Sequence, residues 1–139
     1  MKQSYSIREW LILGLFGILA PFIHFYVQLY WSMLAVPALP VTQSHVGQAF
    51  WLFAGDSIGA ALAALILAAP LAWLVRVRPW ALASLLAVAT AIAALFMWQG
   101  SYTDLAALLT FAELVTFFLL CWVVAHIAVR RVHGAAHAT

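Results

Sequence analysis

Charged residues are scarce in this chain. Only 7% of its 139 residues are Asp, Glu, Lys or Arg, whereas 68% are hydrophobic. A soluble domain carries about 25% charged residues, and a soluble chain this short could not bury so much apolar surface. The six basic residues are spread over short connections and ends, which excludes a patch for polyanions. We therefore expect an integral membrane protein whose main partner is the lipid bilayer, with no nucleic-acid partner.

Cysteine and catalytic motifs are also scarce. The single Cys121 lies in an apolar run, which excludes an intramolecular disulfide and a Cys-x-x-Cys redox or zinc site. The sequence has no His-x-x-x-His zinc motif, no glycine-rich phosphate loop and no Ser/His/Asp arrangement. The motifs thus indicate no metal and no cofactor.

Four long apolar runs are present instead, and they predict helices over about residues 8–35, 46–75, 79–98 and 102–131. Each is long enough to cross a bilayer, which takes about 20 residues. The first run is too long for the core of a signal peptide, so we expect it to be retained. The short connections predict that sequential helices are antiparallel neighbours. We expect an all-α fold, an up-down four-helix bundle forming one transmembrane domain over residues 1–139.

The basic residues predict the orientation of these spans. They occur before the first span, between the second and third, and after the fourth: Lys2, Arg8, Arg76, Arg78, Arg130 and Arg131. The connections over 37–45 and 99–104 contain no Lys or Arg. Because positive charge is retained on the cytoplasmic side, we expect both termini to be cytoplasmic. The composition suits a multi-pass protein of a bacterial inner (plasma) membrane.

Small residues indicate how the helices meet. Gly14 and Gly17 lie on the first helix, and Gly55 and Gly59 are spaced four apart on the second. In membranes, helices associate where small residues let the backbones approach closely. We expect these four glycines to be helix-packing positions.

Three titratable residues fall well inside the predicted spans: His24, Asp56 and Glu113. At 1.5 Å per residue, all three lie roughly 10–15 Å below the outer interface. An ionised group at mid-membrane costs roughly 2.5–3.5 kcal/mol on insertion scales, so we expect these side chains to face the bundle interior. Four nearby polar residues could support this layer: Gln28, Ser57, Thr110 and Thr116.

The layer permits several functions. It could hold helices in register within an accessory or structural subunit of a larger transporter or respiratory complex, which is the reading we favour from sequence. It could instead be the proton or cation pathway of a carrier or channel, which we expect to be homo-oligomeric because four short helices leave a narrow lumen. A third alternative is an intramembrane isomerase or cyclase using Glu113, Asp56 and His24 on an apolar lipid-like substrate. A histidine with two carboxylates also resembles a non-haem iron ligand set in kind, although no local ligand spacing supports a metal.

Overall fold

The structure, a computed structural model, describes residues 6–35, 44–75, 77–97 and 104–136, and these ranges are helical apart from short ends and turns. The helices are α1 (Ile7–Ala35), α2 (His45–Leu74), α3 (Pro79–Met97) and α4 (Asp104–Ala136). Each contains a stretch long and apolar enough to cross a membrane. The chain is thus a small, all-helical, multi-pass membrane protein.

Local hydrogen bonds explain where the first two helices begin. At α1, the Ser6 N–H donates to Glu9 Oε2 (2.8 Å), and the Glu9 N–H donates to Ser6 Oγ (3.2 Å). This reciprocal pair is a capping box, which satisfies two backbone donors of the first turn. At α2, Ser44 Oγ accepts from the Gly47 N–H at 2.9 Å, so the helix begins at His45 rather than at the predicted residue 46.

The last helix is longer than the sequence predicts. Its expected end was about residue 131, because Gly134 and the small residues after it indicate fraying, yet α4 continues to Ala136. A glycine inside a helix costs only about 1 kcal/mol relative to alanine, the best helix former. A single glycine followed by two alanines is therefore not enough to end α4.

The cap of α2 leads to a first testable expectation. Replacing Ser44 with Ala removes the acceptor for the Gly47 N–H and should lower the free energy of unfolding by about 1 kcal/mol. Ser32→Ala is the matched control, because Ser32 Oγ donates to the Leu29 carbonyl of its own helix. The measurement is reversible unfolding in mixed detergent micelles followed by circular dichroism. Equal losses in both variants would show that the cap contributes nothing specific.

The four helices surround a common centre, but not in chain order. The most extensive contact is between α2 and α4, followed by α1 with α2, α3 with α4, and α1 with α3. The consecutive helices α2 and α3 make little contact, so the prediction that all sequential helices are close neighbours is wrong for this pair. The order around the bundle is α1, α2, α4, α3, which places α1 and α4 diagonally opposite each other.

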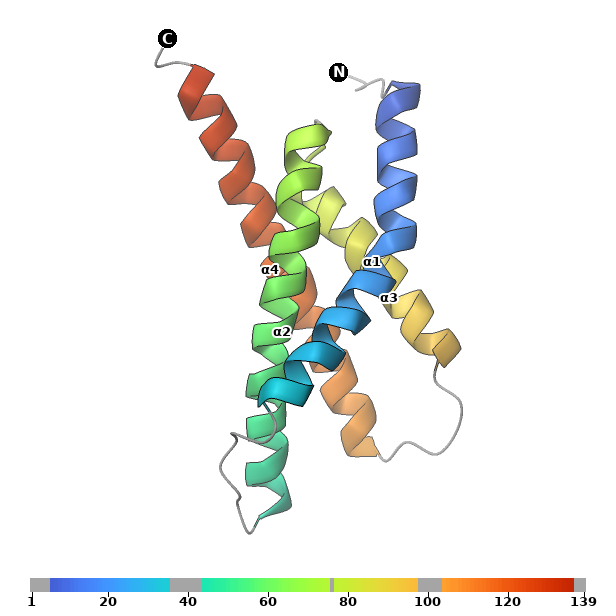
Figure 1. Cartoon of the computed structure of the whole chain (residues 1–139), viewed down its shortest axis with the longest axis vertical. Helices are drawn as coiled ribbons and strands as arrows, with labels where there is room; N and C mark the ends of the chain where they lie inside the picture. The colour runs from blue at the N-terminus through green and yellow to red at the C-terminus, as the bar shows by residue number, and fades with distance from the viewer. Residues whose placement is uncertain (1–5, 36–43, 76, 98–103, 137–139) are drawn as a thin grey trace.

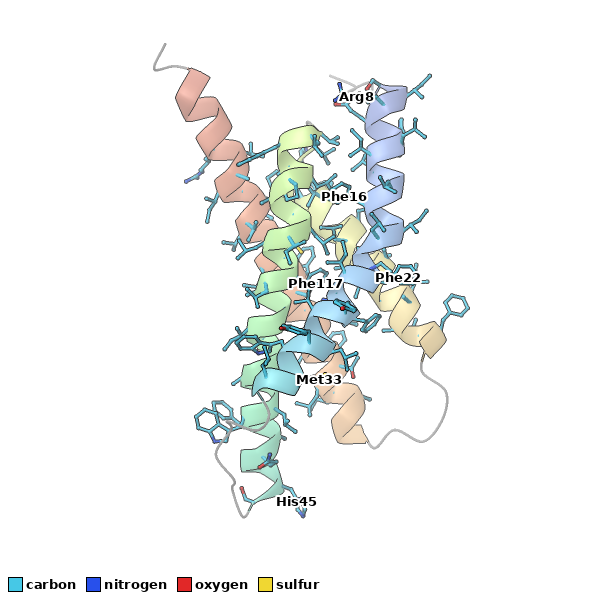
Figure 2. The ribbon with its side chains drawn as sticks, viewed as in Figure 1. Arg8, Phe16, Phe22, Met33, His45 and Phe117 are labelled. Carbon is cyan, nitrogen blue, oxygen red and sulfur yellow. The ribbon has the colours of Figure 1, made fainter. Side chains whose placement is uncertain are left out.

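Figure 1 shows the start of α1 and the end of α4 at one end of the molecule, while α2 begins at the other end. Arg8 and His45 mark these two ends in Figure 2. The axis of α1 also changes direction near Phe22, next to the internal Pro21 (Figures 1 and 2). Proline removes a backbone hydrogen bond and kinks a helix. The bend turns the second half of α1 across α2.

Small side chains make up much of the buried core. On α2 the buried residues recur three to four positions apart and are mostly alanine and glycine: Gly55, Gly59, Ala60, Ala63, Ala64, Leu67, Ala68, Leu71 and Ala72. On α4 the buried set is Phe117, Cys121, Ala125 and Ala128. Small side chains in these rows allow close backbone approach, and α2 and α4 make the most extensive contact in the bundle.

The four predicted packing glycines differ in their surroundings. Gly55 and Gly59 are buried, and a Cβ built on Gly59 would collide with the Gln28 side chain. A Cβ on Gly17 would meet Leu85 of α3 at an ordinary 3.7 Å. Gly14 is exposed, and a Cβ there would have no atom within 4 Å in the described structure. Among the described residues, Gly14 thus does not lie against a neighbouring helix, and its packing role stays a prediction.

Candidate functional site

His24 is at the centre of the polar layer. Its ring is 1% exposed, and its Nε2 lies 3.1 Å from Oε1 of Glu113, whose side chain is 23% exposed. The contact joins α1 to α4 across the diagonal of the bundle. A single proton satisfies it in either position: the Glu113 hydroxyl donates to Nε2, or the Nε2–H donates to the carboxylate.

Gln28 extends this contact to a third helix. It lies one turn after His24 on α1, on the same helical face. Its Nε2 donates to Glu113 Oε1 at 2.7 Å and to the backbone carbonyl of Asp56 on α2 at 3.0 Å. One amide therefore ties α1 to both α2 and α4 at the level of the carboxyl groups.

The Asp56 carboxyl is the second acid of the layer. It is partly exposed, and its residue's backbone carbonyl accepts from the same Gln28 amide that donates to Glu113. Histidine is the only basic residue type within the described middle of the spans, and His24 is the one that contacts an acid there. The layer thus combines two acids with one histidine that is neutral unless it takes up a proton.

Three buried polar atoms at this layer have no hydrogen-bond partner in the described structure: Nδ1 of His24, Oε1 of Gln28 and Nε1 of Trp31. Leaving such a group unsatisfied costs about 1–3 kcal/mol. Whichever ring nitrogen carries a proton, Nδ1 of His24 has no partner among the described residues, whereas Nε2 lies 3.1 Å from Glu113 Oε1.

The predicted supporting residues are used differently. The hydroxyl groups of Ser57 and Thr116 donate to the carbonyls of Phe53 and Ala112, four residues earlier in their own helices, both at 2.8 Å. Thr110 lines an apolar groove between α3 and α4. Gln28 differs from the three hydroxyl residues in bonding to both Glu113 and the Asp56 carbonyl, a distinction that the sequence did not predict.

Sequence reasoning missed two aromatic members of the site. The ring of Phe117 is fully buried and packs on His24, with ring centroids 4.4 Å apart; Figure 2 shows Phe117 in the middle of the bundle. Trp31, which would be read as an interfacial anchor, lies beside Gln28 and Gly59. The available signal was helical spacing, because Phe117 follows Glu113 by four residues and Trp31 follows His24 by seven.

The residues around the polar layer bear on the two alternative hypotheses of a metal site and of an enzyme active site. Among the described residues, no three His, Cys, Asp or Glu side chains gather to hold a metal ion. Two cavities border α3, one of about 290 Å³ against α4 and one of about 400 Å³, and neither is lined by His24, Asp56 or Glu113. His24 instead packs against the rings of Phe25 and Phe117, with centroids 5.4 and 4.4 Å away.

Comparisons with models of protein families, with curated proteins and with solved structures found no match to this chain. Its class is therefore defined by its own features: a small multi-pass membrane protein of four apolar helices. Its distinguishing feature is a buried His–Glu–Gln cluster that joins three of these helices.

Proposed function

We propose that this protein is a proton-coupled carrier or channel, and that Glu113 and His24 exchange the proton. The observation that carries the proposal is the 3.1 Å contact between a fully buried histidine and a membrane-embedded glutamate. Uncharged side chains could hold three helices together equally well by hydrogen bonds. Ionisable groups at this depth are costly, and they mark ion and proton pathways in membrane proteins.

We propose that the protein resides in the inner membrane with both termini in the cytoplasm. We also propose that its four helices run alternately up and down. Arg8 and Arg130 are exposed near the two helix ends that lie together in Figure 1, and Arg78 is exposed in the connection between α2 and α3. Lys2 and Arg76 lie outside the described residues. The positive-inside rule supports a cytoplasmic location for this end of the bundle.

The proposal is tested by proton flux into proteoliposomes that contain a pH-sensitive dye, driven by a potassium diffusion potential. The wild type should acidify the interior faster than protein-free liposomes do. Asp56→Asn removes the second ionisable carboxyl of the layer and should reduce the flux severalfold, because the electrostatic environment of the exchanging pair changes. Wild-type flux equal to that of protein-free liposomes would contradict the proposal.

A second candidate is an accessory subunit of a larger membrane complex. The specific observation is Gly14, which is exposed on α1 between the exposed apolar side chains of Leu11, Leu15 and Ile18. A glycine with open space before it lets another helix approach closely. Native mass spectrometry of protein extracted gently from its own membrane separates the cases. A hetero-complex would support the subunit, whereas a monomer or homo-oligomer would favour the carrier.

A further inference from the structure

The two ends of the bundle lie at different distances from the polar layer's neighbours. One end carries Arg8 at the start of α1 and Arg130 near the end of α4, and we call it the arginine end (Figure 1). At the opposite end α2 begins, where Figure 2 marks His45. At 1.5 Å per residue, Asp56 and Glu113 lie roughly 14–16 Å along α2 and α4 from the starts of these helices. The polar layer is therefore deep within the bundle.

The buried core extends from the polar layer toward the arginine end. On α2 its residues run from Gly55 to Ala72, and on α4 from Phe117 to Ala128. Their apolar members pack into one cluster with residues of α1 and α3. Toward the opposite end, no residue is buried at positions 45–54 of α2 or 107–116 of α4, where the structure describes burial. The layer thus lies at the boundary between a close-packed core and more open helix ends.

One face of α1 changes from apolar to polar at His24. Residues three or four apart share a helical face, and this face carries Gly17 and Ala20 toward the arginine end but Gln28 and Trp31 toward the other. Buried atoms of His24, Gln28 and Trp31 have no hydrogen-bond partner in the described structure: Nδ1, Oε1 and Nε1, respectively. Each would gain a hydrogen bond from water entering on the polar side, whereas the side chains of Gly17 and Ala20 offer none.

The Phe117 ring separates the His24–Glu113 pair from the core. It lies one turn after Glu113 on α4 and packs on the imidazole, with ring centroids 4.4 Å apart. One turn further, Cys121 is also fully buried. The buried part of α4, from Phe117 to Ala128, is roughly 16 Å long at 1.5 Å per residue. Apolar spaces inside proteins stay dry, so a proton would not cross this stretch while the ring keeps its place.

We propose that Glu113 takes its proton from water at the end opposite the arginine end, and that the Phe117 ring is the barrier to release toward the arginines. A hydronium ion gives its proton to the Glu113 carboxylate and leaves as water, and the proton is then shared with Nε2 of His24. This inference rests on the proposed function, because it names the side from which the same pair is loaded. In alternating access, a site opens to one side at a time.

The side of access is tested with a membrane-impermeant maleimide on right-side-out and inverted vesicles that contain the full chain. Asp56→Cys is the probe, because the Gln28 amide bonds to the backbone carbonyl of this residue, which the change retains. Ile7→Cys and His45→Cys, at exposed positions, report which vesicle face carries each end. All three are made together with Cys121→Ala. The probe should react at least about tenfold faster from the face of His45→Cys, since from the other face it must wait for the core to open.

The native Cys121 reports on the barrier. Its thiol is buried, so in the otherwise unchanged protein it should be unreactive from both faces. Phe117→Ala leaves a cavity between this thiol and the polar layer, and reaction from the His45 face should rise at least about tenfold because the core opens more easily. Phe117→Leu keeps an apolar side chain and should give a smaller rise. Phe111→Ala is the matched control, because it truncates a ring of the same helix that is 66% exposed, and it should change nothing.

The outcomes separate this inference from the proposed function. Reaction of Asp56→Cys mainly from the Ile7 face, equally from both faces or from neither would overturn the side of access. Equal reactivity of Cys121 in the wild type and in both Phe117 variants would overturn the barrier. Labelling as expected without proton flux in the wild type would contradict the proposed function alone. Proton flux with labelling from the Ile7 face would overturn this inference alone.

Discussion

Glu113→Gln is expected to reduce proton flux to the level of protein-free liposomes while the protein stays folded. The amide is nearly the same shape as the carboxyl. Its oxygen can still accept from Gln28, which donates to Oε1 in the wild type, and from the Nε2–H tautomer of His24, whose Nε2 lies 3.1 Å from Oε1. It cannot bind or release a proton at physiological pH. The free energy of unfolding should therefore change by less than about 1 kcal/mol, because hydrogen bonds within membranes contribute modestly.

Glu113→Ala separates the chemical role from the structural one. This variant loses both hydrogen bonds that end on Oε1, and at about 0.6–2 kcal/mol for each bond it should lose roughly 1–4 kcal/mol of stability as well as the flux. Thr90→Val is the control, because Thr90 is buried in α3 and its hydroxyl donates to the Leu86 carbonyl of the same helix. Flux and unfolding are measured on the same preparations. Undiminished flux in Glu113→Gln would show that Glu113 does not carry the proton.

Gly59→Ala is expected to destabilise the contact between α1 and α2. The new Cβ would collide with the Gln28 amide oxygen and would lie 3.0 Å from its Cδ and 3.4 Å from Cδ1 of Trp31. Gln28 cannot simply move away, because its Nε2 bonds to Glu113 and to the Asp56 carbonyl. Either a bond breaks or α1 shifts, and overpacking of this kind costs about 1–3 kcal/mol.

Gly14→Ala is the matched control for this variant. The same change of residue is made in the same kind of structure, yet the new Cβ would have no described atom within 4 Å. Any gain in helix propensity is shared by the two variants, so their difference isolates the collision at Gly59. We expect Gly59→Ala to be less stable than Gly14→Ala by about 1–3 kcal/mol in detergent unfolding. Equal stabilities would mean that Gln28 is not held as the structure indicates.

The spans could be predicted closely because lipid imposes a strict rule on the chain. Every backbone polar group within the hydrocarbon must be satisfied internally, so long apolar runs form helices. The third helix was expected over residues 79–98 and extends over Pro79–Met97. The fourth helix departs most from its predicted range, because a glycine near a helix end only weakly disfavours continuation of the helix.

The members of the polar layer could be chosen from depth and composition, because the same rule makes buried charge rare and conspicuous. Which residues these members contact could not be predicted from the sequence. The contact between His24 and Glu113 depends on α1 and α4 lying diagonally opposite each other, and chain order favours a different set of neighbours. The roles of these residues in proton exchange, and of Asp56 beside them, stay predictions.

Local chemistry was thus sufficient for the four helices, for their apolar surfaces and for the depth of the ionisable residues, since each depends on residues close together in the chain. Tertiary packing selected which helices meet. The bend near Pro21, the small residues of α2 and the absence of a side chain at Gly59 bring Gln28 to two other helices. Such contacts join residues far apart in the chain, and they follow from how whole helix surfaces fit together, which periodicity and hydropathy do not specify.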